Sequence, residues 1–175
     1  MKLNAIMLAT AMTLVTSSVA YAAGQGSGTV TFEGDIVNAP CSISPGTTDQ
    51  TIAMGQVSNR VLTTVGESTP QPFNIELQGC DVNTTNDQIT FTFNGLADPA
   101  NANLFALNGT ASGAGIRLVD PAGKDIKPHT ATAPLNLGNG NATLTFNASL
   151  KHSNASAAVV PGRFNSTVNF EVAYQ

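Results

Sequence analysis

Residues 28–43 read Gly28-Thr29-Val30-Thr31-Phe32-Glu33-Gly34-Asp35-Ile36-Val37-Asn38-Ala39-Pro40-Cys41-Ser42-Ile43, and they set the expected class of fold. From position 28 to 36, apolar residues and glycines alternate with polar residues. Period two over this length predicts a β-strand with one buried face. Because glycine weakens a strand, Gly34 is expected where another surface approaches the backbone closely. The predicted buried face consists of Gly28, Val30, Phe32, Gly34 and Ile36.

The rest of the chain is a series of short alternating runs separated by turn residues, including a turn over residues 45–49. Such a series predicts an all-β sandwich or barrel, and no stretch has the pattern of a long helix. The last run, residues 164–175, is the most regular. The expected strands cover residues 50–54, 73–77, 89–93, 103–107, 116–119 and 144–150. One face of the last run is formed by Phe164, Ser166, Val168, Phe170, Val172 and Tyr174.

The first 22 residues have the features of a secretory signal peptide. Lys2 precedes an apolar stretch over residues 3–19, and Ala20-Tyr21-Ala22 has the small-x-small pattern of a cleavage site. We expect cleavage after Ala22 or Ala23. A transmembrane anchor is the alternative, but the apolar stretch is short for one. Export is therefore expected, and residues 23–175 suffice for one domain with one core.

The sequence contains two cysteines, Cys41 and Cys80. In an exported protein a single pair predicts a structural disulfide, worth about 4 kcal/mol for a loop of this length. The alternative is a redox or metal-binding pair. The spacing is too wide for a C-x-x-C motif, and neither His129 nor His152 is near a cysteine in the sequence. The disulfide is therefore the expected state.

The composition argues against several classes of function. Charged residues make up 10% of the chain, the net charge is −4 and there is no tryptophan, so no basic patch for nucleic acid is expected. The two histidines are far apart and no nucleophile elbow is present, so no catalytic site is expected. Asp120 and Asp125 flank a turn and are interpreted as solvated carboxylates. We expect no metal, no cofactor and no small-molecule substrate.

Several segments together resemble one protein family, the chaperone–usher pilins, and in particular the major subunits of P-type and type 1 fimbriae. Residues 30–43 are similar to the start of these subunits, and residues 115–120 to their middle strand. Gly162 is fourteenth from the end and Tyr174 penultimate, as in pilin tails. The other matching segments are Ile52-Ala53-Met54-Gly55-Gln56-Val57 and Phe73-Asn74-Ile75-Glu76-Leu77-Gln78-Gly79-Cys80-Asp81.

The resemblance implies an incomplete immunoglobulin-like sandwich that lacks its seventh strand and is completed in trans by a donor strand. The implied arrangement is physically reasonable, because an open apolar edge needs a cover, and pilins are a known example of strand addition. The implied organisation is a signal peptide over residues 1–22, a donor extension over 23–37 and a pilin domain over 38–175. The implied donor residues are Gly28, Val30, Phe32, Gly34 and Ile36. The implied groove edge, which chaperone and usher would also recognise, comprises Gly162, Phe164, Val168, Phe170, Val172 and Tyr174.

The expected function is a structural subunit of a surface fimbria that polymerises by donor-strand exchange and supports adhesion. The implied partners are other copies of the chain, other pilins, a periplasmic chaperone and an outer-membrane usher. Alternatives are a minor adaptor or terminator pilin, a receptor-binding adhesin and a secreted enzyme. Residues 28–37 could also be the first strand of a complete sandwich, although an antibody-like domain usually has a tryptophan between its cysteines.

Overall fold

The computed structural model describes residues 27–175, and it divides the chain into two units. The predicted signal peptide lies outside the described residues. The second unit, Val37–Gln175, contains every described helix and strand. Residues 27–39 form no β-ladder, so the alternative in which residues 28–37 are the first strand of a complete sandwich is wrong. A strand needs a partner for its backbone groups, and this segment has none within residues 27–175.

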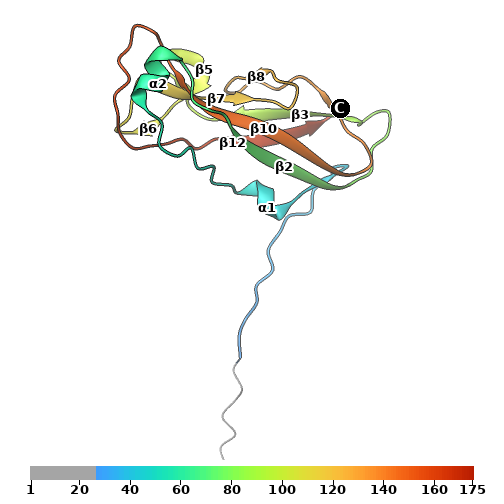
Figure 1. Ribbon diagram of the computed structural model, residues 1–175. Coiled ribbons are helices and arrows are strands. Elements are labelled where there is room, and N and C mark those ends of the chain that lie inside the picture. Colours follow the sequence, from blue (N-terminus) through green and yellow to red (C-terminus); the bar gives the residue numbers. More distant parts are fainter. Residues whose placement is uncertain (1–26) are drawn as a thin grey trace, which may run out of the picture. The chain divides into compact units, whose positions relative to one another are not determined.

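One large antiparallel sheet forms the first layer of the domain, with its long strands side by side (Figure 1). In the register of its centre, Leu144 lies opposite Ile75 and Leu150 lies opposite Ile116. The sheet therefore directs alternate apolar side chains into the interior. In spatial order the strands are β1 (Ser42–Ile43), β2 (Gln71–Cys80), β10 (Gly140–His152), β7 (Ala114–Val119), β5 (Asn101–Phe105) and β4 (Ala97–Asp98), with β8 (Asp125–Ile126) paired to β7.

A smaller sheet packs against the first, and the two layers form a β-sandwich. Its strands are β12 (Asn169–Tyr174), β3 (Gln88–Asn94) and β9 (Leu135–Asn136), in that spatial order. A separate two-stranded ladder joins β11 (Phe164–Asn165) to β6 (Asn108–Gly109). The final apolar run is therefore divided between two short strands, and the sequence pattern did not predict this interruption.

Phenylalanines dominate the core between the sheets. The Phe146 ring from β10 lies 5.1 Å from the Phe91 ring and 5.4 Å from the Phe93 ring, both in edge-to-face geometry. Phe73 stacks on Phe146 at 5.5 Å between ring centroids. Such pairs add to the burial of apolar area, which is the main stabilising term. The core thus bridges the two sheets through one aromatic cluster.

Two short helices lie in the connection between β1 and β2: α1 (Pro45–Thr48) and α2 (Asn59–Thr64). The turn predicted over residues 45–49 is a single helical turn. The strand predicted over residues 50–54 is wrong, because this extended segment pairs with no strand. Among the described residues, none of the helices has both the length and the apolar character needed to cross a membrane.

Cys41 and Cys80 form a disulfide, as predicted from the export signal. Cys41 directly precedes β1, and Cys80 is the last residue of β2. The bond therefore ties the start of the domain to the end of β2, and not to a strand over residues 28–37. Because β1 and β2 are also paired, the bond fixes the point at which the N-terminal segment joins the domain.

Candidate functional site

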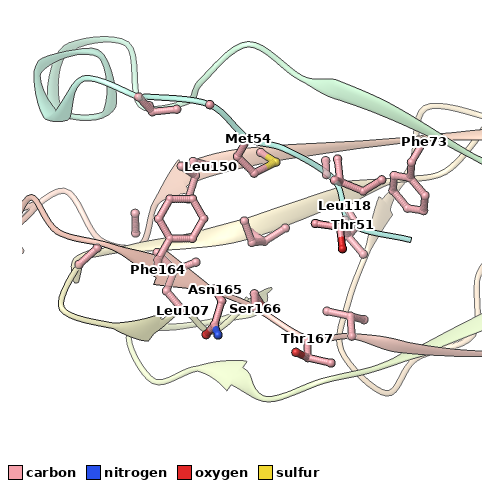
Figure 2. Close-up of a pocket in the computed structure, with 18 of the residues that line it drawn as sticks. Thr51, Met54, Phe73, Leu107, Leu118, Leu150, Phe164, Asn165, Ser166 and Thr167 are labelled. Atoms are coloured by element: carbon pink, nitrogen blue, oxygen red, sulfur yellow. The ribbon is translucent and has the colours of Figure 1, made fainter. Parts of the chain in front are cut away.

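A groove of about 1240 Å³ opens beside the last strand of the domain. One wall is the extended segment over residues 49–57, and the other follows residues 161–170. Figure 2 shows Thr51 and Met54 on the first wall and Asn165 and Thr167 on the second. Core residues of both sheets form the floor: Ile75, Phe93, Ile116, Leu118, Ala148 and Leu150. The groove therefore reaches the hydrophobic core.

The groove wall reaches Phe170, and the open edge of β12 continues from it. Gln175 and Gln88 exchange two backbone hydrogen bonds, of 2.9 and 3.0 Å, so the backbone of Gln175 points toward β3. Backbone direction alternates along a strand, so the N–H and C=O groups of Phe170, Val172 and Tyr174 point the other way. No strand within residues 27–175 pairs with that side. The edge is available for a further strand.

The apolar row predicted along this edge is half-buried against the core. The Phe170 ring lies 6.4 Å from that of Phe91 and 6.2 Å from that of Phe93. Burial raises the pKa of the Tyr174 phenol above its ordinary value. The alternate residues of the strand are exposed. The even-numbered residues therefore present their apolar side chains to the core and their backbone groups to the open edge of the sheet.

Gly162, at one end of this edge, has no room for a side chain. A Cβ atom there would lie 2.5 Å from the backbone nitrogen of Ala111 and 2.5 Å from Thr110 Oγ1. Backbone hydrogen bonds hold the two segments together, among them Thr110 N–H to the carbonyl of Arg163 at 2.9 Å. Gly162 thus permits a close crossing of two chain segments at the end of the groove.

The residues predicted to form a donor strand are strongly exposed. Phe32 keeps 91% of its surface accessible and Val30 keeps 73%, although such side chains are usually buried. Ile36 is fully exposed. A Cβ atom at Gly34 would meet nothing within 4 Å. The structure leaves this amphipathic segment without a surface to cover its apolar face.

Sequence reasoning missed the wall opposite β12. Ile52, Met54 and Val57 are partly buried, and Met54 and Val57 pack against the core, yet the segment forms no ladder with any described strand. The alternation in this segment was visible, but it was interpreted as an ordinary strand. The sequence contains two amphipathic segments, residues 50–57 and 164–174, and no described strand of the same chain pairs with both. That combination would have indicated a groove between them.

The two histidines serve local structure. His129 Nδ1 lies 3.1 Å from Asn94 Oδ1, and His152 Nε2 lies 2.8 Å from the carbonyl oxygen of Ala157. Asp120 is buried, so its interpretation as a solvated carboxylate is wrong. Its carboxylate accepts a hydrogen bond from the backbone N–H of Lys124 at 2.7 Å, which stabilises its turn. Within residues 27–175, no three His, Cys, Asp or Glu residues gather as a metal site.

A two-layer sandwich with an open edge beside an apolar groove is the arrangement implied by the resemblance to pilus subunits, and comparison with known proteins agrees. The family model described as "Fimbrial protein" matches residues 30–175. The chain therefore belongs to the fimbrial protein family. It has an immunoglobulin-like fold, and it is a structural subunit of a bacterial fimbria.

Individual relatives place the chain more closely. It is 51% identical to the Fimbria A protein of Serratia marcescens and 41% identical to the major MR/P fimbria protein of Proteus mirabilis, covering 100% of each chain. Among solved structures it resembles a chaperone–usher pilus subunit, with a TM-score of 0.79 and 34% identity over 86% of this chain and 97% of that one. The P pilus rod subunit PapA matches with a TM-score of 0.70 and 31% identity, over 78% and 100% of the chains.

Proposed function

We propose that this chain is the repeated shaft subunit of its fimbria, without enzymatic activity, and that residues 28–36 of each copy, here called the arm, fill the groove of a neighbour. The proposal rests on one observation: within residues 27–175, the same chain contains an amphipathic segment without a partner and a sheet edge without a partner. The arm has an exposed apolar face, and β12 has an open edge above an apolar groove. Strand addition would complete both halves at once.

The energetics favour such an exchange. Burying Val30, Phe32 and Ile36 contributes about 1.5–3 kcal/mol each, or about 5–9 kcal/mol together. Ladder hydrogen bonds add about 1 kcal/mol each. Ordering the arm costs a comparable amount. The persistence of the fibre therefore depends on slow dissociation as well as on net affinity.

Before assembly the groove needs another cover, because an open apolar edge promotes aggregation. We assign this role to a periplasmic chaperone, with an outer-membrane usher receiving the complex on the way to the cell surface. Residues 1–22 would direct export, residues 23–37 would contain the arm, and residues 38–175 would form the pilin domain. A minor adaptor pilin is the alternative, and the copy number in purified fibres separates the two.

Substitutions on the two faces of the arm test the proposal. Gly34→Arg places a long charged side chain on the groove face, where burial without a partner is unfavourable. Glu33→Arg places the same side chain on the opposite face. We expect Gly34→Arg to stop fibre assembly while chaperone co-purification persists, and Glu33→Arg to have a mild effect. Normal assembly of Gly34→Arg, or a stronger defect in Glu33→Arg, would contradict the proposal.

A further inference from the structure

Resting on the proposed function, we infer that a charged pair between copies positions the incoming arm: Asp35 of one copy faces Arg163 of the next. In this arrangement the arm runs antiparallel to β12, and Gly34 faces Phe164. Two independent features of this chain support this arrangement, the first its register and the second its direction. One is the order of large and small residues along the two segments, and the other is the order of charges.

Size complementarity favours this register over the neighbouring ones. A large residue meets a glycine or a serine in four of the pairs, and two valines meet in the fifth. The pairs are Ile36 with Gly162, Gly34 with Phe164, Phe32 with Ser166, Val30 with Val168 and Gly28 with Phe170.

Shifting the antiparallel register by two residues loses this fit. A shift one way sets Phe32 opposite Phe164 and Gly34 opposite Gly162. Two large rings then compete for space in one pair, and no side chain fills the space in the next. A shift the other way sets Ile36 opposite Phe164. Protein interiors are close-packed, and both overpacked and empty positions cost stability. The inferred register avoids both.

Charge order selects the direction. Arg163 lines the groove beside Gly162 and is exposed, and it forms no ion pair within residues 27–175. Glu171, in β12, is also exposed and lies eight residues further along the chain. The arm carries its acidic residues, Glu33 and Asp35, in its second half. An antiparallel arm brings Asp35 to Arg163, whereas a parallel arm brings these carboxylates toward Glu171, and like charges opposite each other are destabilising.

Backbone geometry makes the Asp35–Arg163 pair a close one. Arg163 N–H donates to Thr110 Oγ1 at 3.0 Å, and its carbonyl accepts from Thr110 N–H at 2.9 Å, so its backbone points away from the groove. Opposite an antiparallel arm, Arg163 therefore occupies a non-hydrogen-bonded position. Cα atoms at such positions are about 4.5 Å apart, which is within reach of a disulfide.

Cross-linking within assembled fibres tests the register. In the full mature chain, Asp35→Cys combined with Arg163→Cys is expected to give, after oxidation, a ladder of covalent multimers on a denaturing gel without reductant. The matched control, Asp35→Cys with Glu171→Cys, is expected to remain monomeric on the same gel. Fibres that cross-link through position 171, or fibres that cross-link through neither pair, would overturn the inference.

A charge exchange gives a second readout. Asp35→Arg or Arg163→Asp alone is expected to slow assembly at low salt by roughly two- to fivefold, and the two together to restore it. Lys124→Asp, a similar charge change on the β7–β8 turn, should have no effect. Unchanged rates in both single variants would overturn the charge pairing. Phe32→Asp distinguishes failure of the charge pairing from failure of the proposed function. This variant places a charge on the groove face of the arm, so normal assembly of Phe32→Asp would show that strand addition itself is wrong.

Discussion

The arm and β12 carry the same kind of sequence pattern but have different structures. Both alternate apolar and polar residues, yet residues 169–174 form a ladder with β3 whereas residues 28–36 form none. Phe170 packs against two core rings, while Phe32 is 91% exposed. Periodicity therefore reports which face a strand would bury, and the presence of a partner decides whether the strand forms.

Loss of the disulfide should have the largest effect, because this bond fixes the start of the domain, directly after the arm, to the end of β2. Cys41→Ala with Cys80→Ala is expected to lower the free energy of unfolding by about 4 kcal/mol. Urea unfolding of the oxidised and the double-substituted subunit measures the difference. An unchanged unfolding midpoint would mean that β1 and β2 are held by their ladder alone.

Phe170 and Phe32 provide a matched pair of substitutions. Phe170→Ala removes a half-buried ring from the core side of β12 and should cost about 2–3 kcal/mol of subunit stability. Phe32→Ala should change subunit stability by less than about 0.5 kcal/mol, because its ring is exposed, and should instead slow fibre assembly. Urea unfolding and assembly kinetics on both variants check this. Equal destabilisation by the two would place Phe32 in the subunit's own core.

Gly162 and Gly34 give the corresponding comparison for glycines. Gly162→Ala forces a Cβ atom to 2.5 Å from Thr110 Oγ1 and should cost about 1–3 kcal/mol of subunit stability. Gly34→Ala meets nothing within 4 Å and should leave the subunit unchanged. Thermal unfolding of the two variants distinguishes them. A neutral Gly162→Ala would show that the 110–111 segment moves aside easily.

The smallest expected effect concerns Tyr174, the only tyrosine in residues 23–175. Burial raises its pKa in the folded subunit above the ordinary value of 10.0. The folded state therefore favours the neutral phenol, and this stabilisation is complete below pH 10 and is lost as the pH rises through the folded pKa. Phenolate absorbance should titrate at higher pH in the fibre than in the subunit. A lower pKa in the fibre would contradict further burial of this edge.

Much of the fold could be predicted from the sequence, because the long strands have clear period-two patterns. The runs ending at Leu77, Phe93 and Val119 all lie in strands of the sandwich. The prediction failed in residues 50–54, where apolar and polar residues alternate but no ladder forms. A strand over residues 29–37 stays a prediction for the assembled fibre. The sequence-based prediction also missed α2 and the interruption after Asn165. The interruption depends on hydrogen bonds with the distant β6 segment, and local periodicity contains no information on such partners.

Amide hydrogen exchange, measured residue by residue in the free subunit and in the fibre, tests the central claim most directly. We predict that the amides of the arm and of Phe170, Val172 and Tyr174 exchange rapidly in the free subunit and are protected in the fibre. The amides of Glu171 and Ala173, which face β3, should be protected in both states. Protection of the arm in the free subunit, or continued rapid exchange at Phe170, Val172 and Tyr174 in the fibre, would contradict strand addition at this edge.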